Sequence, residues 1–165
     1  MGNPRTTNEV VKESITLALL ALMKTKRFSE ITVKEITARA GVGRVSFYRN
    51  YDSKEDVIIR HMDHLTIEWG KAFEQEANPN IIKSLFTHFY ANRDLLSLLY
   101  SSGLEHLIFQ SLRNICGPKP EHGNLQAYWQ AMISGAIYSW CIEWIHRGME
   151  ETPEEIAKLN LPARE

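Results

Sequence analysis

The stretch "GVGRVSFYRNY", residues 41–51, sets two glycines in front of a short segment that mixes polar and apolar residues. Closely spaced glycines are typical of loops that bind a nucleotide phosphate. Such loops require G-x-x-x-x-G-K-[ST], or G-x-G-x-x-G directly after a buried strand. The sequence fits neither pattern, because the residues before Gly41 have helical spacing and no parallel sheet is indicated. These glycines therefore belong to a turn between helices.

The residues on both sides of this turn are expected to form two short helices. Thr32 begins "TVKE", a capping box that opens a helix of about two turns, and the second helix covers residues 44–50. Gly41 lies where the chain must reverse sharply, a position suited to positive φ. Phe47 and Tyr51 are four residues apart and face inward. Two helices joined in this way can place the second one in the major groove of DNA.

The run "ITVKEITARAGVGRVSFYRNYDSKEDVI", residues 31–58, resembles the DNA-binding signature of the TetR family of transcriptional regulators. The resemblance lies in the threonine that opens the first helix, the A-G-V turn, the aromatic-tyrosine pair and the S-K-E-D start of the next helix. Short helices around a glycine turn also occur in proteins that never bind DNA, where Arg44 and Arg49 would be ordinary solvated charges. The length of the matching run favours DNA binding.

The resemblance implies a set of DNA-contacting residues within this run. Arg44 would reach a guanine edge, Val45 would pack on a thymine methyl group, and Lys54 would meet a phosphate near a helix N-terminus. The whole set is Thr32, Lys34, Arg44, Val45, Ser46, Tyr48, Asn50 and Lys54. The chain departs from the family pattern at Gly43, Val45 and Thr37. Glycine is a tolerable N-cap in place of serine or threonine, so we expect the fold to be retained.

Apolar residues recur at helical spacing along the chain of 165 residues, which predicts an all-α protein of about nine helices. Residues 1–52 are expected to form a three-helix DNA-binding helix-turn-helix domain. Residues 53–165 are expected to form a helical bundle for ligand binding and dimerisation, joined to the first domain by a helix over residues 53–76. The other helices are expected at about residues 8–24, 81–90, 92–103, 104–117 and 125–147, with a last one after Thr152. The ending "IHRGMEETPEEIAK", residues 145–158, looks like that of a subgroup similar to dihydroxyacetone kinase operon regulators.

The net charge of −1 conceals an asymmetry along the chain. Residues 1–60 hold eleven Lys or Arg and seven Asp or Glu, whereas residues 61–165 hold eight and thirteen. A basic segment followed by an acidic one fits an N-terminal module that binds a polyanion.

Cys116 and Cys141 lack the spacing of a disulfide framework, and the apolar stretch 127–145 is interrupted by polar residues. We therefore expect a cytoplasmic protein without a membrane span.

The C-terminal half is rich in aromatic residues, and the family resemblance implies a pocket for a small-molecule effector there. Tyr90, His106, Phe109 and Trp129 are the candidates for its lining. Pockets and cores use the same apolar residue types, so packing in an ordinary core is the alternative for each of them.

Dimerisation is expected along the long helix near the C-terminus. It carries the small residues Ala127, Ala131, Ser134, Gly135 and Ser139, which permit a second helix to approach closely. The resemblance implies that the last two helices pack on their copies in a homodimer, which would present two recognition helices to a pseudo-palindromic operator. Packing within one subunit is the alternative role of these small residues.

No enzyme, cofactor or metal site is predicted. His61, His64 and Glu68 have spacings that fit one helix face, but no further ligand cluster accompanies them. No catalytic triad or carboxylate pair can be assigned from spacing. The hypothesis from sequence is thus a homodimeric, ligand-responsive repressor that binds double-stranded DNA. The alternative is a helical ligand- or protein-binding module without DNA binding.

Overall fold

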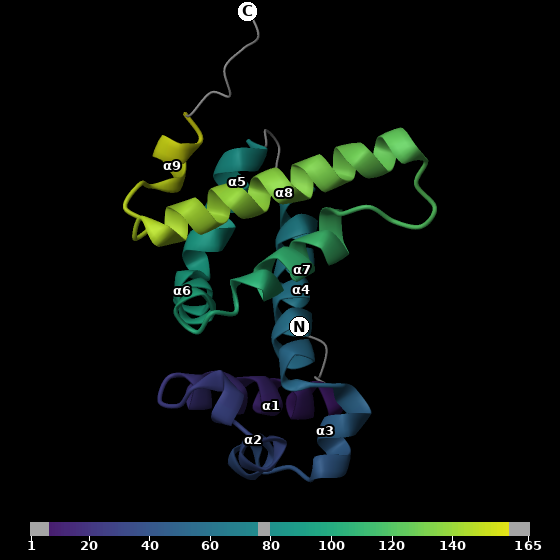
Figure 1. Cartoon of the computed structure of the whole chain (residues 1–165), viewed down its shortest axis with the longest axis vertical. Helices are drawn as coiled ribbons and strands as arrows, with labels where there is room; N and C mark the ends of the chain where they lie inside the picture. The colour runs from purple at the N-terminus through teal and green to yellow at the C-terminus, as the bar shows by residue number, and fades with distance from the viewer. Residues whose placement is uncertain (1–6, 76–79, 159–165) are drawn as a thin grey trace, which may run out of the picture. The chain divides into compact units, whose positions relative to one another are not determined.

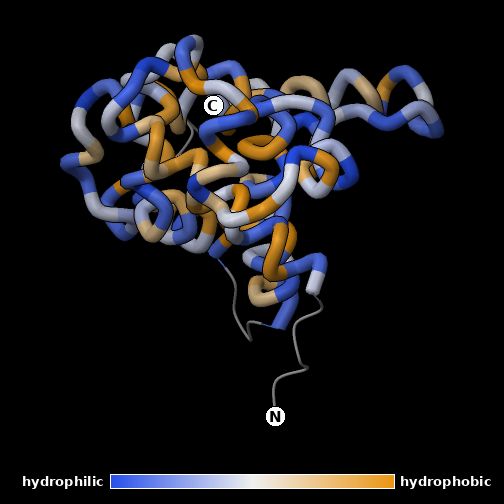
Figure 2. The backbone as a smooth tube through the Cα atoms, turned by 90° about the horizontal axis from the view of Figure 1, so that it is seen from below, coloured by the Kyte–Doolittle hydropathy of each residue, from blue (hydrophilic) through white to orange (hydrophobic). Residues whose placement is uncertain are grey.

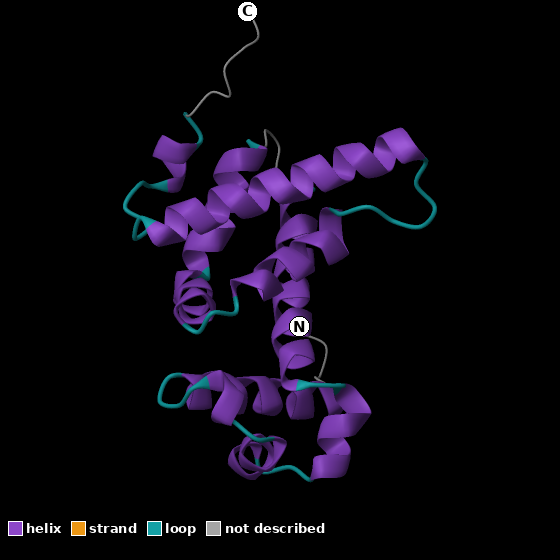
Figure 3. Cartoon of the chain, in the orientation of Figure 1, coloured by secondary structure: helices purple, strands orange, loops and turns teal. Residues whose placement is uncertain are grey.

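The structure is a computed structural model that describes residues 7–75 and 80–158. These residues form nine α-helices and one short 3-10 helix, and no strand occurs among them (Figures 1 and 3). The predicted all-α class is confirmed. The α-helices are α1 (Thr7–Met23), α2 (Val33–Ala40), α3 (Arg44–Asn50), α4 (Lys54–Phe73), α5 (Ile81–Ala91), α6 (Arg93–Ser101), α7 (Glu105–Cys116), α8 (Asn124–His146) and α9 (Pro153–Ile156).

The expected helix boundaries agree closely with the observed ones. Helix α3 covers the residues expected for it. The expected end of the connecting helix at residue 76 lies outside the described residues, and α4 ends at Phe73. The 3-10 helix Phe28–Glu30 was not predicted; it forms the corner between α1 and α2.

The chain divides into two compact units, which meet in sequence between His61 and Met62. The first unit contains α1, α2, α3 and the first two turns of α4. Each of the first three helices packs on the other two. Their buried faces meet in an apolar core, because Ile15, Leu19, Ile36, Phe47 and Val57 are fully buried. This core fixes the positions of α2 and α3, the two helices on either side of the turn at Gly41.

The second unit contains the rest of α4 and helices α5 to α9. Helix α8 packs mainly on α7, and α5 packs on α9. Its core includes Phe86, Leu99, Ile108 and Cys141, all at most 1% exposed. Hydrophobic and hydrophilic segments alternate along the backbone trace, as expected for helices with one buried face (Figure 2).

Candidate DNA-binding surface

The turn between α2 and α3 is closed by backbone geometry. Gly41 ends α2 in the left-handed region at φ +68°, and its N–H donates to the carbonyl of Ala38. The N–H of Val42 donates to the carbonyl of Thr37 at 3.0 Å. A residue with a side chain is strained at this φ, so glycine is required for conformational reasons, as the sequence predicted.

Helix α3 begins without a side-chain cap. Gly43 is its N-cap in extended conformation, and its carbonyl accepts the N–H groups of Ser46 and Phe47 at 3.0 and 3.3 Å. Glycine is disfavoured here by only a few tenths of a kcal/mol relative to serine or threonine. The missing hydroxyl does not prevent the helix from forming.

Helix α3 has one buried face and one exposed face. Phe47 is fully buried and Tyr51 is 4% exposed, with their ring centroids 5.9 Å apart, as the spacing of four residues predicts. On the opposite face Val45 is 73% exposed and Tyr48 is 60% exposed. Arg44, Val45, Tyr48 and Arg49 form this exposed set, which we call the recognition face; Ser46 beside it is half-buried.

Asn50 lies apart from the recognition face. It is 7% exposed, and its side-chain amide donates to the carbonyl of Ser46 at 2.8 Å. This hydrogen bond joins the buried side chain of Asn50 to the preceding turn of α3. The contact of Asn50 with a phosphate stays a prediction. Arg49 is exposed on the recognition face, as the helical period indicates. The predicted set of DNA contacts did not include it.

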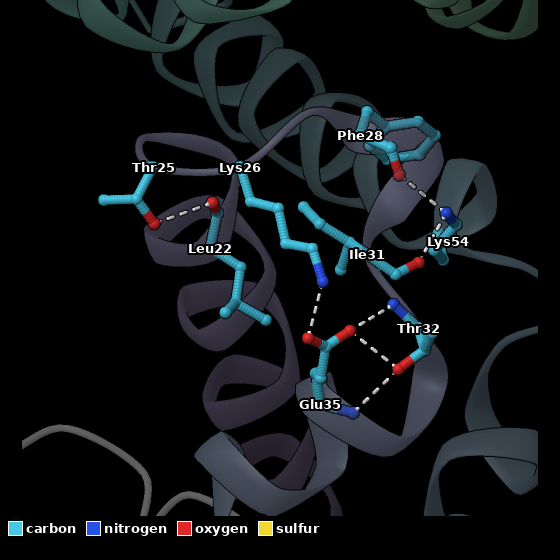
Figure 4. Close-up of polar contacts among 8 residues, drawn as sticks. All are labelled: Leu22, Thr25, Lys26, Phe28, Ile31, Thr32, Glu35 and Lys54. Carbon is cyan, nitrogen blue, oxygen red and sulfur yellow. Dashed lines mark hydrogen bonds and ion pairs between the residues drawn. The ribbon is translucent and has the colours of Figure 1, made fainter.

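The N-terminus of α2 is held by a charged network around Glu35 (Figure 4). The Thr32 hydroxyl accepts the Glu35 N–H at 3.3 Å, and the Glu35 carboxylate accepts the Thr32 N–H at 2.9 Å, which completes the predicted capping box. Lys26 donates to the same carboxylate at 2.7 Å. The lysine and the threonine donors lower the pKa of Glu35 from 4.5 to about 2. Thr32 and Lys34 are both exposed at this helix start, where phosphate contacts were predicted.

Because the folded state lowers the pKa of Glu35, the ionised carboxylate stabilises the first unit above the unfolded pKa, and this stabilisation is lost as pH falls through the folded pKa of about 2. We expect Glu35→Gln, which retains the capping geometry, to have a lower thermal midpoint than the parent near neutral pH. The two midpoints should converge as pH falls from about 5 to 2. Thermal unfolding followed by circular dichroism measures both.

Glu30→Gln is the matched control, because Glu30 likewise pairs with a cationic side chain, that of Arg27, but lies outside the capping box. It should leave the slope of the midpoint against pH close to that of the parent. An equal change of slope in both variants would mean that the network around Glu35 has no special role.

Lys54, at the start of α4, is bound to the corner between α1 and α2 (Figure 4). Its ammonium donates to the carbonyls of Phe28 at 2.8 Å and Ile31 at 2.7 Å, and lies 4.5 Å from the centre of the Phe28 ring. An ammonium has three N–H donors, so these two bonds leave one for a phosphate. Lys54 therefore has a structural role, because it ties the start of α4 to the corner. The predicted contact of Lys54 with a DNA phosphate would be additional to this role.

We expect Lys54→Met to lower the free energy of unfolding by about 1–3 kcal/mol, because hydrogen bonds from a charged donor are lost and two carbonyls lose a partner. Urea unfolding measures the loss. Lys34→Met, an exposed lysine on α2, should change stability by less than about 0.5 kcal/mol. Equal stability losses in the two variants would contradict the structural role of Lys54.

The residues predicted to line an effector pocket differ in their exposure within the second unit. Tyr90 is 41% exposed, with the Arg93 guanidinium 4.7 Å from its ring centre, and Trp129 is 59% exposed. His106 is exposed on α7. Phe109 is half-buried against Tyr138, with ring centroids 5.0 Å apart. A cavity between α4, α5, α6 and α7 is lined by none of these four.

Among residues 7–75 and 80–158, no group of three His, Cys, Asp or Glu side chains is arranged to hold a metal ion. His61, His64 and Glu68 therefore form no such group, and the Glu68 carboxylate pairs with Lys71 at 2.7 Å. No helix in the described ranges combines the length and the apolar character needed to cross a membrane.

Two family models match this chain, one within its first unit and one within its second. Residues 15–60, which contain the turn and the recognition face, match the bacterial regulatory proteins of the tetR family. Residues 77–160, about half of the chain, match the transcriptional regulator C-terminal region. This chain belongs to the TetR family. Members of the TetR family are transcriptional regulators that bind DNA through a helix-turn-helix.

Two individual proteins are similar to this chain. The chain is 26% identical over 181 aligned positions to an uncharacterized HTH-type transcriptional regulator, YxbF, of Bacillus subtilis; the match covers 94% of this chain and 44% of that protein. The chain thus spans less than half the length of this relative. The solved structure of the fatty acid degradation regulator FadR from Bacillus halodurans has a TM-score of 0.54 and 14% identity, covering 99% of this chain and 100% of that one. This similarity shows that the two chains share a fold.

Proposed function

We propose that this chain is a ligand-responsive repressor that binds a pseudo-palindromic operator as a homodimer. The observation that carries the DNA-binding part is the recognition face, where Arg44, Val45, Tyr48 and Arg49 are exposed on a helix anchored by buried Phe47. Arginine suits the O6 and N7 acceptors of guanine, and valine suits the thymine methyl group. Thr32, Lys34, Ser46, Asn50 and Lys54 are proposed as further contacts, chiefly to phosphates.

The homodimer is supported by an apolar stripe on α8. Leu125, Tyr128, Trp129 and Met132 are 84%, 67%, 59% and 53% exposed, and their spacing places them along one face of the helix. Buried residues of the same helix, including Cys141 and Trp144, belong to the core. A helix that is apolar on all sides is expected to be covered on all sides. We infer that a second copy covers the α8 stripe, since two-fold symmetric contact joins the same surface of both subunits.

The small residues of α8 divide between these two environments. Ser134 is fully buried, and its hydroxyl donates to the carbonyls of Gln130 and Ala131 within the helix. Ala131 and Ser139 are exposed, and Ala127 and Gly135 are half-buried. Ser134 therefore packs within one subunit, whereas Ala131 and Ser139 are available to a second copy.

We expect Trp129→Lys to raise the dissociation constant of the dimer by about tenfold or more, because a large aromatic side chain is lost from the proposed interface and a charge is added. Sedimentation velocity over a range of protein concentrations measures this constant. Leu17→Lys, at an apolar residue of α1 that is 61% exposed, should leave it unchanged. A parent protein that sediments as a monomer at all concentrations would refute the homodimer.

The experiment that tests the proposed function is the selection of DNA duplexes from a random pool by the full chain. We expect an enriched pseudo-palindromic site whose affinity falls steeply with salt, because lysine and arginine contacts to phosphates release counterions. Without an enriched site and without salt-dependent binding, the proposal fails. In that case the alternative is a helical ligand- or protein-binding module.

The ending of the chain supports a further proposal about the subgroup and the compartment. The segment that resembles the dihydroxyacetone kinase operon regulators contains the end of α8, the left-handed residues Gly148 and Met149, and a capping box between Thr152 and Glu155 that opens α9. We propose membership in this subgroup and, for a DNA-binding regulator, a cytoplasmic location.

A further inference from the structure

Helix α3 is short and depends on tertiary contacts for its direction. It has seven residues and no side-chain cap at its N-terminus. Helices shorter than about 12 residues are marginal on their own in water, so packing holds them in place. Phe47 anchors the middle of α3 in the core. A single anchor of this kind leaves a short helix free to tilt, so a second attachment is needed to fix the direction of its axis.

A second attachment lies at the C-terminal end of α3, where the chain turns into α4. Tyr51, which caps this end, is 4% exposed, and its N–H donates to the carbonyl of Phe47 at 2.9 Å. The centre of the Tyr51 ring lies 5.9 Å from that of Phe47 and 5.9 Å from the guanidinium carbon of Arg60. A cation within about 6 Å of an aromatic ring centre is attracted to the ring. Tyr51 thus links the end of α3 to a side chain of α4.

Arg60 is itself held by carboxylates near the start of α4. Its Nε donates to one carboxylate oxygen of Asp56 at 2.9 Å, and one of its Nη atoms lies 3.9 Å from the Asp52 carboxylate. The Asp56 side chain is 21% exposed, whereas that of Asp52 is 93% exposed. Water screens an exposed ion pair, so Asp56 is the stronger partner of Arg60.

Asp56 joins Arg60 to the backbone between α3 and α4. Its second carboxylate oxygen accepts the N–H of Asp52 at 3.0 Å, and its own N–H donates to the Ser53 hydroxyl at 3.1 Å. Val57, the next residue of α4, is fully buried. The turn that follows α3 is therefore tied to a part of α4 that is anchored in the core.

We propose that Arg60 is a positioning residue for DNA recognition, although it lies outside the recognition face. Arg60, Tyr51, Asp52 and Asp56 form what we call the Arg60 clamp, which fixes the direction of α3 from its C-terminal end. A recognition face in one fixed direction can make several base contacts at once, and these contacts specify the sequence. A tilted helix loses some of them but keeps contacts to phosphates. The inference rests on the proposed DNA binding by α3.

Hydrogen exchange tests the Arg60 clamp in the full chain without DNA. In Arg60→Met, the amides of Tyr51 and Asp52 should exchange about threefold faster or more, because local opening of this turn becomes easier. The amide of Val42, which donates to the carbonyl of Thr37 before α3, should stay within about twofold of the parent rate. Unchanged rates at Tyr51 and Asp52 overturn the clamp.

Fluorescence anisotropy with the selected duplex and a random duplex tests the positioning role. Arg60→Met should lower the ratio of the two affinities by about threefold or more, since base contacts are lost and phosphate contacts remain. Arg27→Met is the matched control, because Arg27 also pairs with a carboxylate, that of Glu30, but lies at the corner between α1 and α2. It should leave the ratio unchanged. An equal fall in both variants would trace the effect to the lost charge and overturn the positioning role.

Asp56→Asn and the double variant separate one clamp from two independent contacts. Asparagine keeps an oxygen that can accept the Asp52 N–H but loses the charge that pairs with Arg60. The affinity ratio should fall about two- to threefold in Asp56→Asn, and the double variant should match Arg60→Met, because effects within one network are not additive. A fall in the double variant equal to the product of the two single effects overturns the clamp.

Failure of the Arg60 clamp can be distinguished from failure of the proposed function. If the random pool yields no enriched duplex, the proposed DNA binding fails, while hydrogen exchange still reports on the clamp. Faster exchange in Arg60→Met with an unchanged affinity ratio would refute the positioning role. Circular dichroism verifies that each variant is folded.

Discussion

Replacing Phe47 with alanine should lower the free energy of unfolding by about 3–5 kcal/mol, the largest effect expected from a single substitution on α3. Phe47 is fully buried, and its ring lies 5.3 Å from that of Tyr48 and 5.9 Å from that of Tyr51. Truncation removes apolar contacts and leaves a cavity between α3 and the helices beneath it. Urea unfolding followed by circular dichroism and by the amide signals of residues 7–61 measures the loss and locates it.

Tyr48→Ala is the matched control for Phe47→Ala, because the two aromatic residues are neighbours on α3 and differ in exposure. Tyr48 is 60% exposed, so its truncation should cost less than about 1 kcal/mol. Its effect should appear in DNA binding instead. A loss from Phe47→Ala as small as that from Tyr48→Ala would mean that α3 is not anchored as described.

Replacing Arg44 with alanine should weaken binding to the selected operator by about 1–3 kcal/mol and relax the base preference at one position of each half-site. Arg44 is the first residue of α3 and is exposed, so its guanidinium can reach a base edge without leaving a buried partner unpaired. Binding to a random duplex should change less, since phosphate contacts remain. Fluorescence anisotropy with both duplexes gives the two affinities.

Arg147→Ala serves as the control for Arg44→Ala. Arg147 follows α8 and pairs with Glu143 at 2.6 Å. Its removal takes away the same charge from the second unit and should leave operator affinity and base preference unchanged. If Arg44→Ala weakened the selected and random duplexes equally, Arg44 would bind phosphate rather than a base.

The helix boundaries could be predicted because they depend on local sequence. The capping boxes that begin at Thr32 and Thr152 formed as expected, since the interacting groups are three residues apart. Gly41 and Gly148 follow α2 and α8 in the left-handed region, and this could also be predicted because glycine adopts that conformation readily at helix ends. The burial of Phe47 and Tyr51 followed from the helical period.

The tertiary partners of individual polar residues could not be predicted in this way. Lys54 donates to the carbonyls of Phe28 and Ile31, which lie 26 and 23 residues earlier in the chain, and no local sequence pattern predicts such contacts. Asn50 has a polar side chain at a position that the sequence placed near DNA, yet it turns inward to the carbonyl of Ser46. Both outcomes depend on how the helices of the first unit pack.

The cavity in the second unit was also beyond prediction from sequence. The family resemblance implied a pocket, and the candidates for its lining were mainly aromatic residues. Aromatic residues occupy surfaces and ordinary core contacts as well; Trp129, for example, is exposed on α8. The cavity is lined mainly by leucine, isoleucine and methionine, with His88 as its titratable group. Which leucines of a helix meet a void is decided by the approach of neighbouring helices.

The two faces of α3 also have an evolutionary consequence. Residues that hold the helix in place, such as Phe47, are separate from those that face outward, such as Val45 and Tyr48. Substitutions at the outward positions cost little stability, so gene duplicates can acquire new operator preferences step by step while remaining folded. Among descendants of this protein, divergence should therefore concentrate at positions 44, 45 and 48, and the inward positions should change slowly.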